Sequence, residues 1–262
     1  MSLFDFFPEL KKRNSLLFWF GGFNVLLLLL AAMMFFVDDT IISGINAWIK
    51  PMKFAMTVII YCWTFAWLLE YLPSQGKKKV ISVLIIICMA VENGFIFLQA
   101  FRGVRSHFNV QTAFDGIVFS IMGLFILINS FVILYTIVLF FSGNVKLETR
   151  MLWAWRAGLI LFFLGGISGG IMSGLLTHTV GASDGGPGLP FLNWSTVAGD
   201  IRTAHFFTLH GLQIIPLAAF AAGEISKQYG GTISILFVSL YVGFCIWLHW
   251  IAFQGLPLFV VG

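Results

Sequence analysis

The sequence is short of charge. Only 10% of its 262 residues are Asp, Glu, Lys or Arg, whereas a soluble domain carries about 25%, so an ordinary soluble fold is excluded. Cysteine is also scarce, and Cys62, Cys88 and Cys245 lie inside apolar runs without a C-x-x-C spacing. This pattern excludes a disulfide framework and a thiolate metal site.

Other absences narrow the function classes. The chain has no internal repeat, and it has no inverted pair of helices broken by Gly or Pro, which many secondary transporters contain. No lysine lies in the middle of the last apolar stretch, which argues against a retinal Schiff base. The net charge of +4 is explained by membrane topology, so we expect no nucleic-acid partner.

Apolar residues make up 59% of the chain, with 30 Phe and a mean hydropathy of +0.96. A bilayer core of about 30 Å needs about 20 apolar residues per helix. Seven stretches meet this length: 16–37, 53–73, 79–101, 112–142, 152–176, 200–222 and 232–257. The sequence therefore predicts an all-α integral membrane protein, a single domain of seven transmembrane helices over 1–262.

The basic residues predict the orientation, because cytoplasmic loops carry the excess of Lys and Arg. With the N-terminus inside, ten of the 15 basic residues face the cytoplasm: Lys11, Lys12, Arg13, Lys77, Lys78, Lys79, Lys146, Arg150, Arg156 and Lys227. We therefore expect a cytoplasmic N-terminus, an outside C-terminus and the plasma (inner) membrane. The lipid bilayer is the one expected macroscopic partner, and the sequence does not indicate an oligomeric state.

One connection is unusually long. Residues 177–199 contain Gly185, Gly186, Pro187 and Gly188, a composition that breaks regular helix. Long loops in compact proteins are commonly functional. We expect an ordered outer loop here.

Polar residues form a stripe on the third stretch. Glu92, Gln99 and Arg102 are spaced i, i+7 and i+10, which places them on nearly the same helix face. Glu92 lies roughly 15 Å from the outer helix end. A carboxylate at this depth needs a partner, so Glu92 is either hydrogen-bonded to a neighbour such as Asn93 or a base or metal ligand.

A second polar segment joins the third and fourth stretches. It contains Arg102, Arg105, His107 and Asn109, and Asp115 follows one turn into the next helix. An ion-pair set at a helix junction explains most of it. His107 is the additional feature that indicates a ligand.

The sixth stretch carries Asp200, Arg202, His205, His210 and Gln213. Its two histidines are five residues apart, so they do not form the i, i+4 pair of H-E-x-x-H. Any metal would need ligands from several helices. His249 of the seventh stretch lies at about the depth of His210 and Glu92.

These residues lead to a first hypothesis, a metal-dependent membrane enzyme, a hydrolase or an oxidoreductase, that acts on a small lipid-like or amphipathic substrate. Zinc or iron would be bound by His107, His205, His210 and Glu92. The catalytic carboxylates would be Glu92, Asp115 and Asp200. The substrate would be bound by Gln99, Arg102, Asn109, Arg202 and Gln213.

Two alternatives stay open. In the first, the protein is a redox protein with haem b, whose axial ligands are His210 and His249. Glycines of the fifth stretch would leave room for the ring, although close helix packing explains them equally well. In the second, the protein is a proton- or ion-coupled carrier or a small-ligand receptor, because intramembrane acids bind protons and ions in such proteins.

Overall fold

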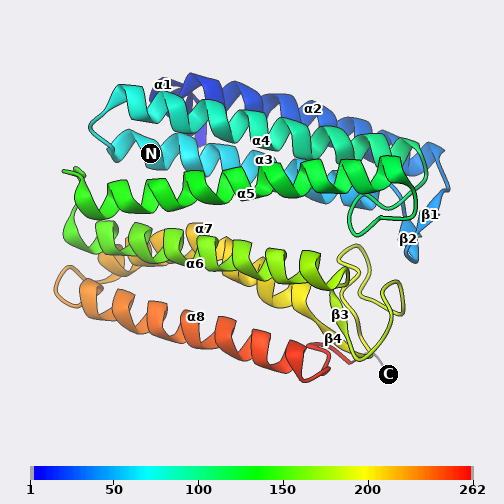
Figure 1. The fold of residues 1–262 in the computed structure, drawn as a ribbon. Coiled ribbons are helices and arrows are strands. Elements are labelled where there is room, and N and C mark those ends of the chain that lie inside the picture. Colours follow the sequence, from blue (N-terminus) through cyan, green and yellow to red (C-terminus); the bar gives the residue numbers. More distant parts are fainter. Residues whose placement is uncertain (1–2, 261–262) are drawn as a thin grey trace. The chain divides into compact units, whose positions relative to one another are not determined.

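The computed structural model describes residues 3–260, which contain eight α-helices (Figure 1). Their bounds are α1 Leu3–Arg13, α2 Ser15–Val37, α3 Ile49–Leu68, α4 Gln75–Phe101, α5 Ala113–Ser142, α6 Thr149–Leu175, α7 Ile201–Ile225 and α8 Gly230–Phe253. A 3-10 turn, Leu69–Tyr71, extends α3. Seven helices, α2 to α8, are long and apolar enough to cross a membrane. The prediction of an all-α multi-pass membrane protein is confirmed.

The chain divides into two compact units. Unit 1 comprises Met1–Leu139 and Gly143–Lys146, and unit 2 comprises Phe140–Ser142 and Leu147–Gly262. Each unit is therefore described by itself. The expectation of a single domain stays a prediction.

Capping residues set several helix starts. The side chains of Asn14, Ser74 and Thr112 accept hydrogen bonds from the first turns of α2, α4 and α5, as expected of N-caps. Three predicted limits are wrong by four residues, and one of them is the start of α4, which is Gln75 rather than 79. The third helix begins at Ile49 rather than 53, because a proline such as Pro51 is tolerated in a first turn. The last helix ends at Phe253 rather than 257, because Gly255 takes a positive φ of 76°.

In unit 1, aromatic and polar contacts align the helix ends. The Trp48 ring lies edge-on to Phe101, with 4.6 Å between centroids, so the start of α3 lies beside the end of α4. Gln99 bonds Asp115, which brings the start of α5 to the same level. A short hairpin, β1 Ile41–Ile42 and β2 Ile45–Asn46, lies at this end (Figure 1). This end of unit 1 holds the polar segment 102–115.

In unit 2, α7 packs against both α6 and α8. Glycines allow the close approach of α6 and α7: a Cβ on Gly158 would lie 3.1 Å from the Gly211 carbonyl oxygen. The strands β3 Thr179–Val180 and β4 Gly199–Asp200 pair antiparallel. This pairing joins the two ends of the long loop that follows α6.

Candidate functional site

Glu92 is buried in the interior of unit 1, with 2% of its surface exposed. It lies on α4 one turn before Ile96, which packs with Val118, Met122 and Phe54. Among the described residues, no donor reaches its Oε2 atom. Since a buried carboxylate oxygen without a partner is costly, this atom is the strongest sign of a ligand or proton site in unit 1.

His107 is the residue that meets Glu92. Its Nε2 atom lies 3.3 Å from Glu92 Oε1, slightly beyond the usual hydrogen-bond range. Ser106 Oγ lies 3.1 Å from the other ring nitrogen, Nδ1. When Ser106 donates to Nδ1, the neutral imidazole directs Nε2–H at Glu92. The loop thus supplies a proton donor to a helix carboxylate.

The surroundings of His107 disfavour its charged form. Burial lowers the pKa of His107, and the positive charge of Lys50 at the start of α3 lowers it further, although Glu92 opposes both effects. Aromatic rings form the apolar wall, with Phe54 at 5.6 Å and Phe119 at 6.4 Å between centroids. The site therefore combines a carboxylate, a neutral imidazole and an ammonium group beside apolar rings.

A hydrogen-bonded clamp holds the two ends of the 102–112 loop. Asp115 Oδ1 accepts hydrogen bonds from Arg102 Nη1 at 2.5 Å and from Gln99 Nε2 at 2.9 Å. Thr112 Oγ1 donates to Asp115 Oδ2 at 2.6 Å. Arg102 also donates to Gln99 Oε1. Three predicted site residues thus meet, and together they position the loop that carries His107.

Asn109 shapes this loop from inside. It is 4% exposed, its Nδ2 donates to the Arg105 carbonyl at 3.1 Å, and its Oδ1 accepts from the Gln111 amide at 3.3 Å. The neighbouring Phe108 takes a positive φ of 58°, an unfavourable conformation for an aromatic residue that functional sites often retain. These two bonds span residues 105–111 and so hold the loop backbone on both sides of His107.

In unit 2, Asp200 anchors the long loop to α7. Its carboxylate accepts from Arg202 Nε at 2.9 Å, from Arg202 Nη2 at 2.6 Å and from the Ser195 amide at 2.9 Å. Arg202 also donates to the Asn193 carbonyl. These contacts explain why a carboxylate that is 2% exposed is tolerated there. Asp200 and Arg202, predicted as catalytic and substrate-binding, meet each other.

Two further side chains beside this ion pair, His178 and Asp184, were not among the site residues predicted from the sequence. His178 Nδ1 lies 3.3 Å from Asp184 and 3.8 Å from Asp200. Burial alone would raise the pKa of Asp184, but hydrogen bonds from Thr179 and Thr177 and the neighbouring His178 lower it overall. A cavity of about 180 Å³ adjoins His178 and Arg202. The Thr-His-Thr run followed by Asp184 was the available signal, but only the loop's fold shows the contact.

The histidines of the membrane-spanning helices of unit 2 have different neighbours. His205 Nδ1 lies 2.8 Å from the Gly165 carbonyl oxygen, and His249 Nδ1 lies 2.8 Å from that of Cys245. The His210 ring packs on Phe206 at 4.3 Å between centroids. Within residues 3–260, no group of three or more His, Cys, Asp or Glu side chains is arranged to hold a metal ion.

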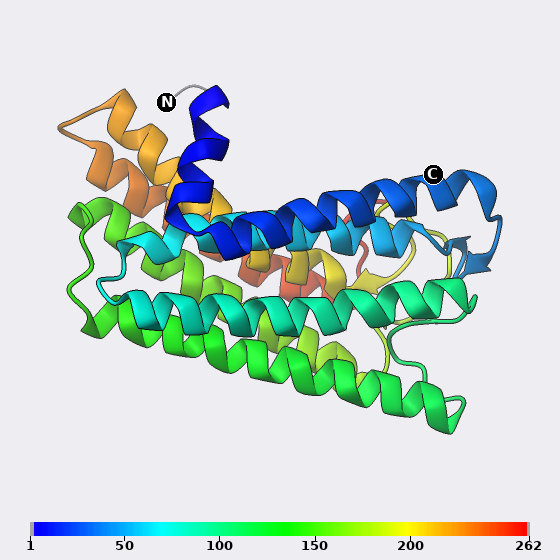
Figure 2. The ribbon, with the colours of Figure 1, turned by 90° about the horizontal axis from the view of Figure 1, so that it is seen from above.

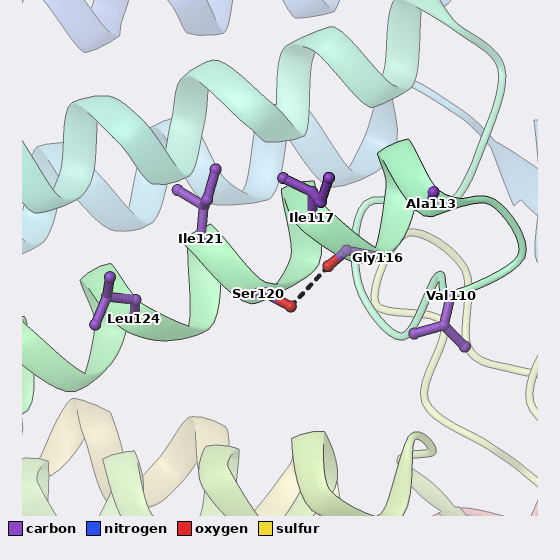
Figure 3. Close-up of a pocket in the computed structure, with 7 residues that line it drawn as sticks. All are labelled: Val110, Ala113, Gly116, Ile117, Ser120, Ile121 and Leu124. Carbon is purple, nitrogen blue, oxygen red and sulfur yellow. Dashed lines mark hydrogen bonds between the residues drawn. The ribbon is translucent and has the colours of Figure 1, made fainter.

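A shallow apolar groove of about 460 Å³ runs along α5 (Figure 3). Its lining includes the small residues Ala113, Gly116 and Ser120, and the Ser120 hydroxyl donates to the Gly116 carbonyl at 2.7 Å. The lining residues are Val110, Ala113, Gly116, Ile117, Ser120, Ile121 and Leu124. An apolar surface of this kind is compatible with acyl chains.

Comparison with known proteins adds no relative. No family model matches the chain, no curated protein matches it, and no solved structure matches it. The function is therefore inferred from the geometry of these side chains.

Proposed function

We propose that this multi-pass membrane protein binds a small amphipathic ligand in unit 1 and exchanges a proton there, as a proton-coupled carrier or receptor. Glu92 and His107 are the proton-binding pair. One observation carries the proposal: a carboxylate that is 2% exposed has a single neighbouring imidazole at 3.3 Å and a second oxygen without a donor. Burial at this depth favours a group that gains or loses a proton when a ligand arrives.

The electrostatics support a proton more than a permanent ion pair. Because burial and Lys50 disfavour charged His107, the imidazole offers a neutral hydrogen bond rather than a positive charge. The unpaired Oε2 atom of Glu92 can then gain a partner in two ways: it binds a proton, or it accepts a hydrogen bond from a ligand. Ligand binding and protonation compete for the same oxygen, and this competition couples them.

The neighbours of the pair suggest the ligand class. Lys50 attracts an anionic or strongly polar head group, while Phe54 and Phe119 offer apolar surface. Asp115 holds Arg102 and Gln99 at the loop ends, so these residues position the loop. An amphipathic molecule with an acidic or polar head matches this arrangement.

A metal-dependent enzyme is the second candidate, and the 3.3 Å distance between His107 Nε2 and Glu92 Oε1 favours it. Two ligands at about 2.0–2.1 Å from a tetrahedral ion lie roughly 3.3 Å apart, which is the separation of His107 Nε2 and Glu92 Oε1. The ion would be zinc or iron, and Glu92 Oε2 would bind it or act as a base. Haem b held by His210 and His249 remains the third hypothesis, which the measurement below also tests.

The proposed site faces outward. Ten of the 15 basic residues belong to the predicted cytoplasmic side, which supports a cytoplasmic N-terminus, an outside C-terminus and the plasma membrane. Under this orientation Glu92, His107 and the loop after α6 lie in the outer half. The ligand would then arrive from outside or from the outer leaflet.

The test is infrared titration of purified protein in nanodiscs, which detects the C=O band of a protonated carboxyl group. We expect a pH-dependent band that E92Q removes and that E224Q, at an exposed glutamate (61% of its side chain), leaves unchanged. An E92Q spectrum identical to wild type at every pH overturns the proposal.

Elemental analysis and an absorption spectrum of the same preparations distinguish the other candidates. Stoichiometric zinc or iron that is lost in both E92Q and H107Q, without a Soret band, supports the metal enzyme and overturns the proton proposal. A Soret band that disappears in H210A supports the haem protein and overturns both of the others.

A further inference from the structure

The helix α1 is amphipathic and projects at a steep angle from the start of α2 (Figure 2), where it contacts α2 and α3. Its apolar side is anchored: Phe6 stacks on Trp67 at 5.8 Å between centroids, Phe7 meets Trp63 at 5.3 Å, and Leu10 is fully buried. Lys11 and Lys12 are exposed. A short amphipathic helix with lysines beside a span is typical of helices that lie in the membrane interface.

Two acidic side chains near this end of unit 1, Glu9 and Glu70, are paired with the more buried basic side chains Arg13 and Lys78. Glu9 bonds Arg13 at 2.8 Å, and the Arg13 guanidinium lies 3.9 Å from the Trp67 ring centroid. Glu70 bonds Lys78 at 2.9 Å. The exposed cations are therefore left over, and in the described part of the chain no ion pair involves Lys11, Lys12, Lys77, Lys79 or Lys146.

Two of these cations lie where the helix itself disfavours them. Lys77 and Lys79 belong to the first turns of α4, which begins at Gln75 after the cap Ser74. The N-terminus of a helix carries partial positive charge, so lysines there are unfavourable and anions are favourable. An anion bound at this surface would offset the repulsion between these lysines and the positive end of the helix dipole.

Aromatic side chains mark the same level as a membrane interface. Lys11 Nζ lies 5.2 Å from the ring centroid of Trp19, a side chain that is 61% exposed. Trp67 donates to the Tyr71 hydroxyl at 3.0 Å. Trp and Tyr gather at the headgroup level of bilayers.

We infer that this end of unit 1 binds the headgroup phosphates of anionic phospholipids, with α1 lying in the interface and Lys11, Lys12, Lys77, Lys79 and Lys146 facing the lipid. Juxtamembrane lysine clusters attract anionic lipids of the cytoplasmic leaflet. The inference concerns the end of unit 1 opposite to His107 and does not depend on the proposed function.

The experiment measures lipid bound per protein by mass spectrometry, in nanodiscs of phosphatidylcholine with increasing phosphatidylglycerol. Wild type should retain phosphatidylglycerol preferentially. The double variants K11Q/K12Q and K77Q/K79Q should lose about fivefold in preference for each lysine removed. The control R105Q/K227Q removes the same charge outside this surface and should keep the preference.

Circular dichroism and melting temperature check that the variants are folded. A preference that falls equally in the control overturns the inference, since it then reflects net charge alone. Preference unchanged in both lysine variants also overturns it. Inorganic phosphate that binds to wild type in pure phosphatidylcholine nanodiscs as strongly as phosphatidylglycerol does would identify a soluble anion as the ligand and would overturn the lipid assignment.

Discussion

His107 Nε2 lies 3.3 Å from Glu92 Oε1, and this contact joins a loop residue to the interior of a membrane-spanning helix. Among the described residues, no ion-pair contact other than this one involves Glu92 or His107, and no donor reaches Glu92 Oε2. The pair therefore responds to anything that changes the charge of either group. The first prediction follows from this response.

The free energy of unfolding should fall as the pH is lowered below about 6.5, the ordinary pKa of histidine. Burial and Lys50 lower the pKa of folded His107, so in this window the unfolded chain binds a proton that the folded protein does not. Stability is then complete above about pH 6.5 and declines as the pH falls towards the lowered pKa. Melting temperatures in detergent between pH 8 and pH 5 measure the effect. H107Q should show a smaller pH dependence, and equal curves for the two proteins would refute the explanation.

Loss of the Asp115 carboxylate should release the loop that carries His107. D115N weakens the bonds from Arg102, Gln99 and Thr112, so we expect a melting temperature lower by several degrees. Hydrogen exchange of the 103–111 amides should become faster. E148Q, which changes a glutamate whose side chain is 64% exposed, serves as the control. Unchanged exchange in D115N would contradict the role of Asp115 as a clamp.

Two glycines of α6 should respond in opposite directions to alanine. In G158A the new methyl group would lie 3.1 Å from the Gly211 oxygen and 3.1 Å from Leu212 Cα, and because these are backbone atoms we expect destabilisation of about 1–3 kcal/mol. In G170A the methyl group meets open space, and better helix propensity should stabilise by up to about 1 kcal/mol. The melting temperatures of G158A and G170A, each compared with wild type, test this prediction. Equal changes in the two variants would argue against close α6–α7 packing.

The Tyr61–Asn129 bond should stabilise unit 1 measurably. The Tyr61 hydroxyl donates to Asn129 Oδ1 at 2.9 Å, and both residues are buried. Y61F removes this donor and should cost about 1 kcal/mol. A double-mutant cycle with N129L should give a coupling of about 0.6 kcal/mol or more. A coupling of zero would mean that the bond contributes nothing to the packing of α3 on α5.

Removal of the Arg202 guanidinium should open the long loop of unit 2. R202Q leaves the buried Asp200 carboxylate without its charged partner, and breaking such a pair costs about 3 kcal/mol. Limited proteolysis should then cut within residues 180–199 faster than in wild type. S183A, at an exposed residue beside the same cavity, should be cut at the wild-type rate. Cleavage of the loop in R202Q at the wild-type rate would contradict this role of Arg202.

Part of the candidate site was predictable because local rules control it. The i, i+7, i+10 spacing placed Gln99 and Arg102 on one face of α4, and the structure joins both to Asp115. The same rule grouped Glu92 with them, yet Glu92 meets His107 instead. Helical periodicity assigns a residue to a face, but it does not say which loop residue folds onto that face.

The loop contacts were beyond sequence reasoning for a similar reason. His178 and Asp184 are six residues apart in a segment without periodicity, so no spacing rule brings them together. Hydrogen bonds from the Thr177 hydroxyl and the Thr179 amide to Asp184 Oδ1 do so, because they fold the loop back on itself. The amphipathic helix α1 was also missed, because its 11 residues are too short for a membrane span.

The sequence by itself determined the class of this protein. Seven apolar stretches of bilayer length specify transmembrane helices, because unpaired backbone groups are not tolerated in lipid. Only the tertiary structure decided which polar groups meet, since that depends on the rotation of each helix and on the path of each loop. Glu92 has His107 as its neighbour because a clamped loop with a strained Phe108 carries the imidazole to it.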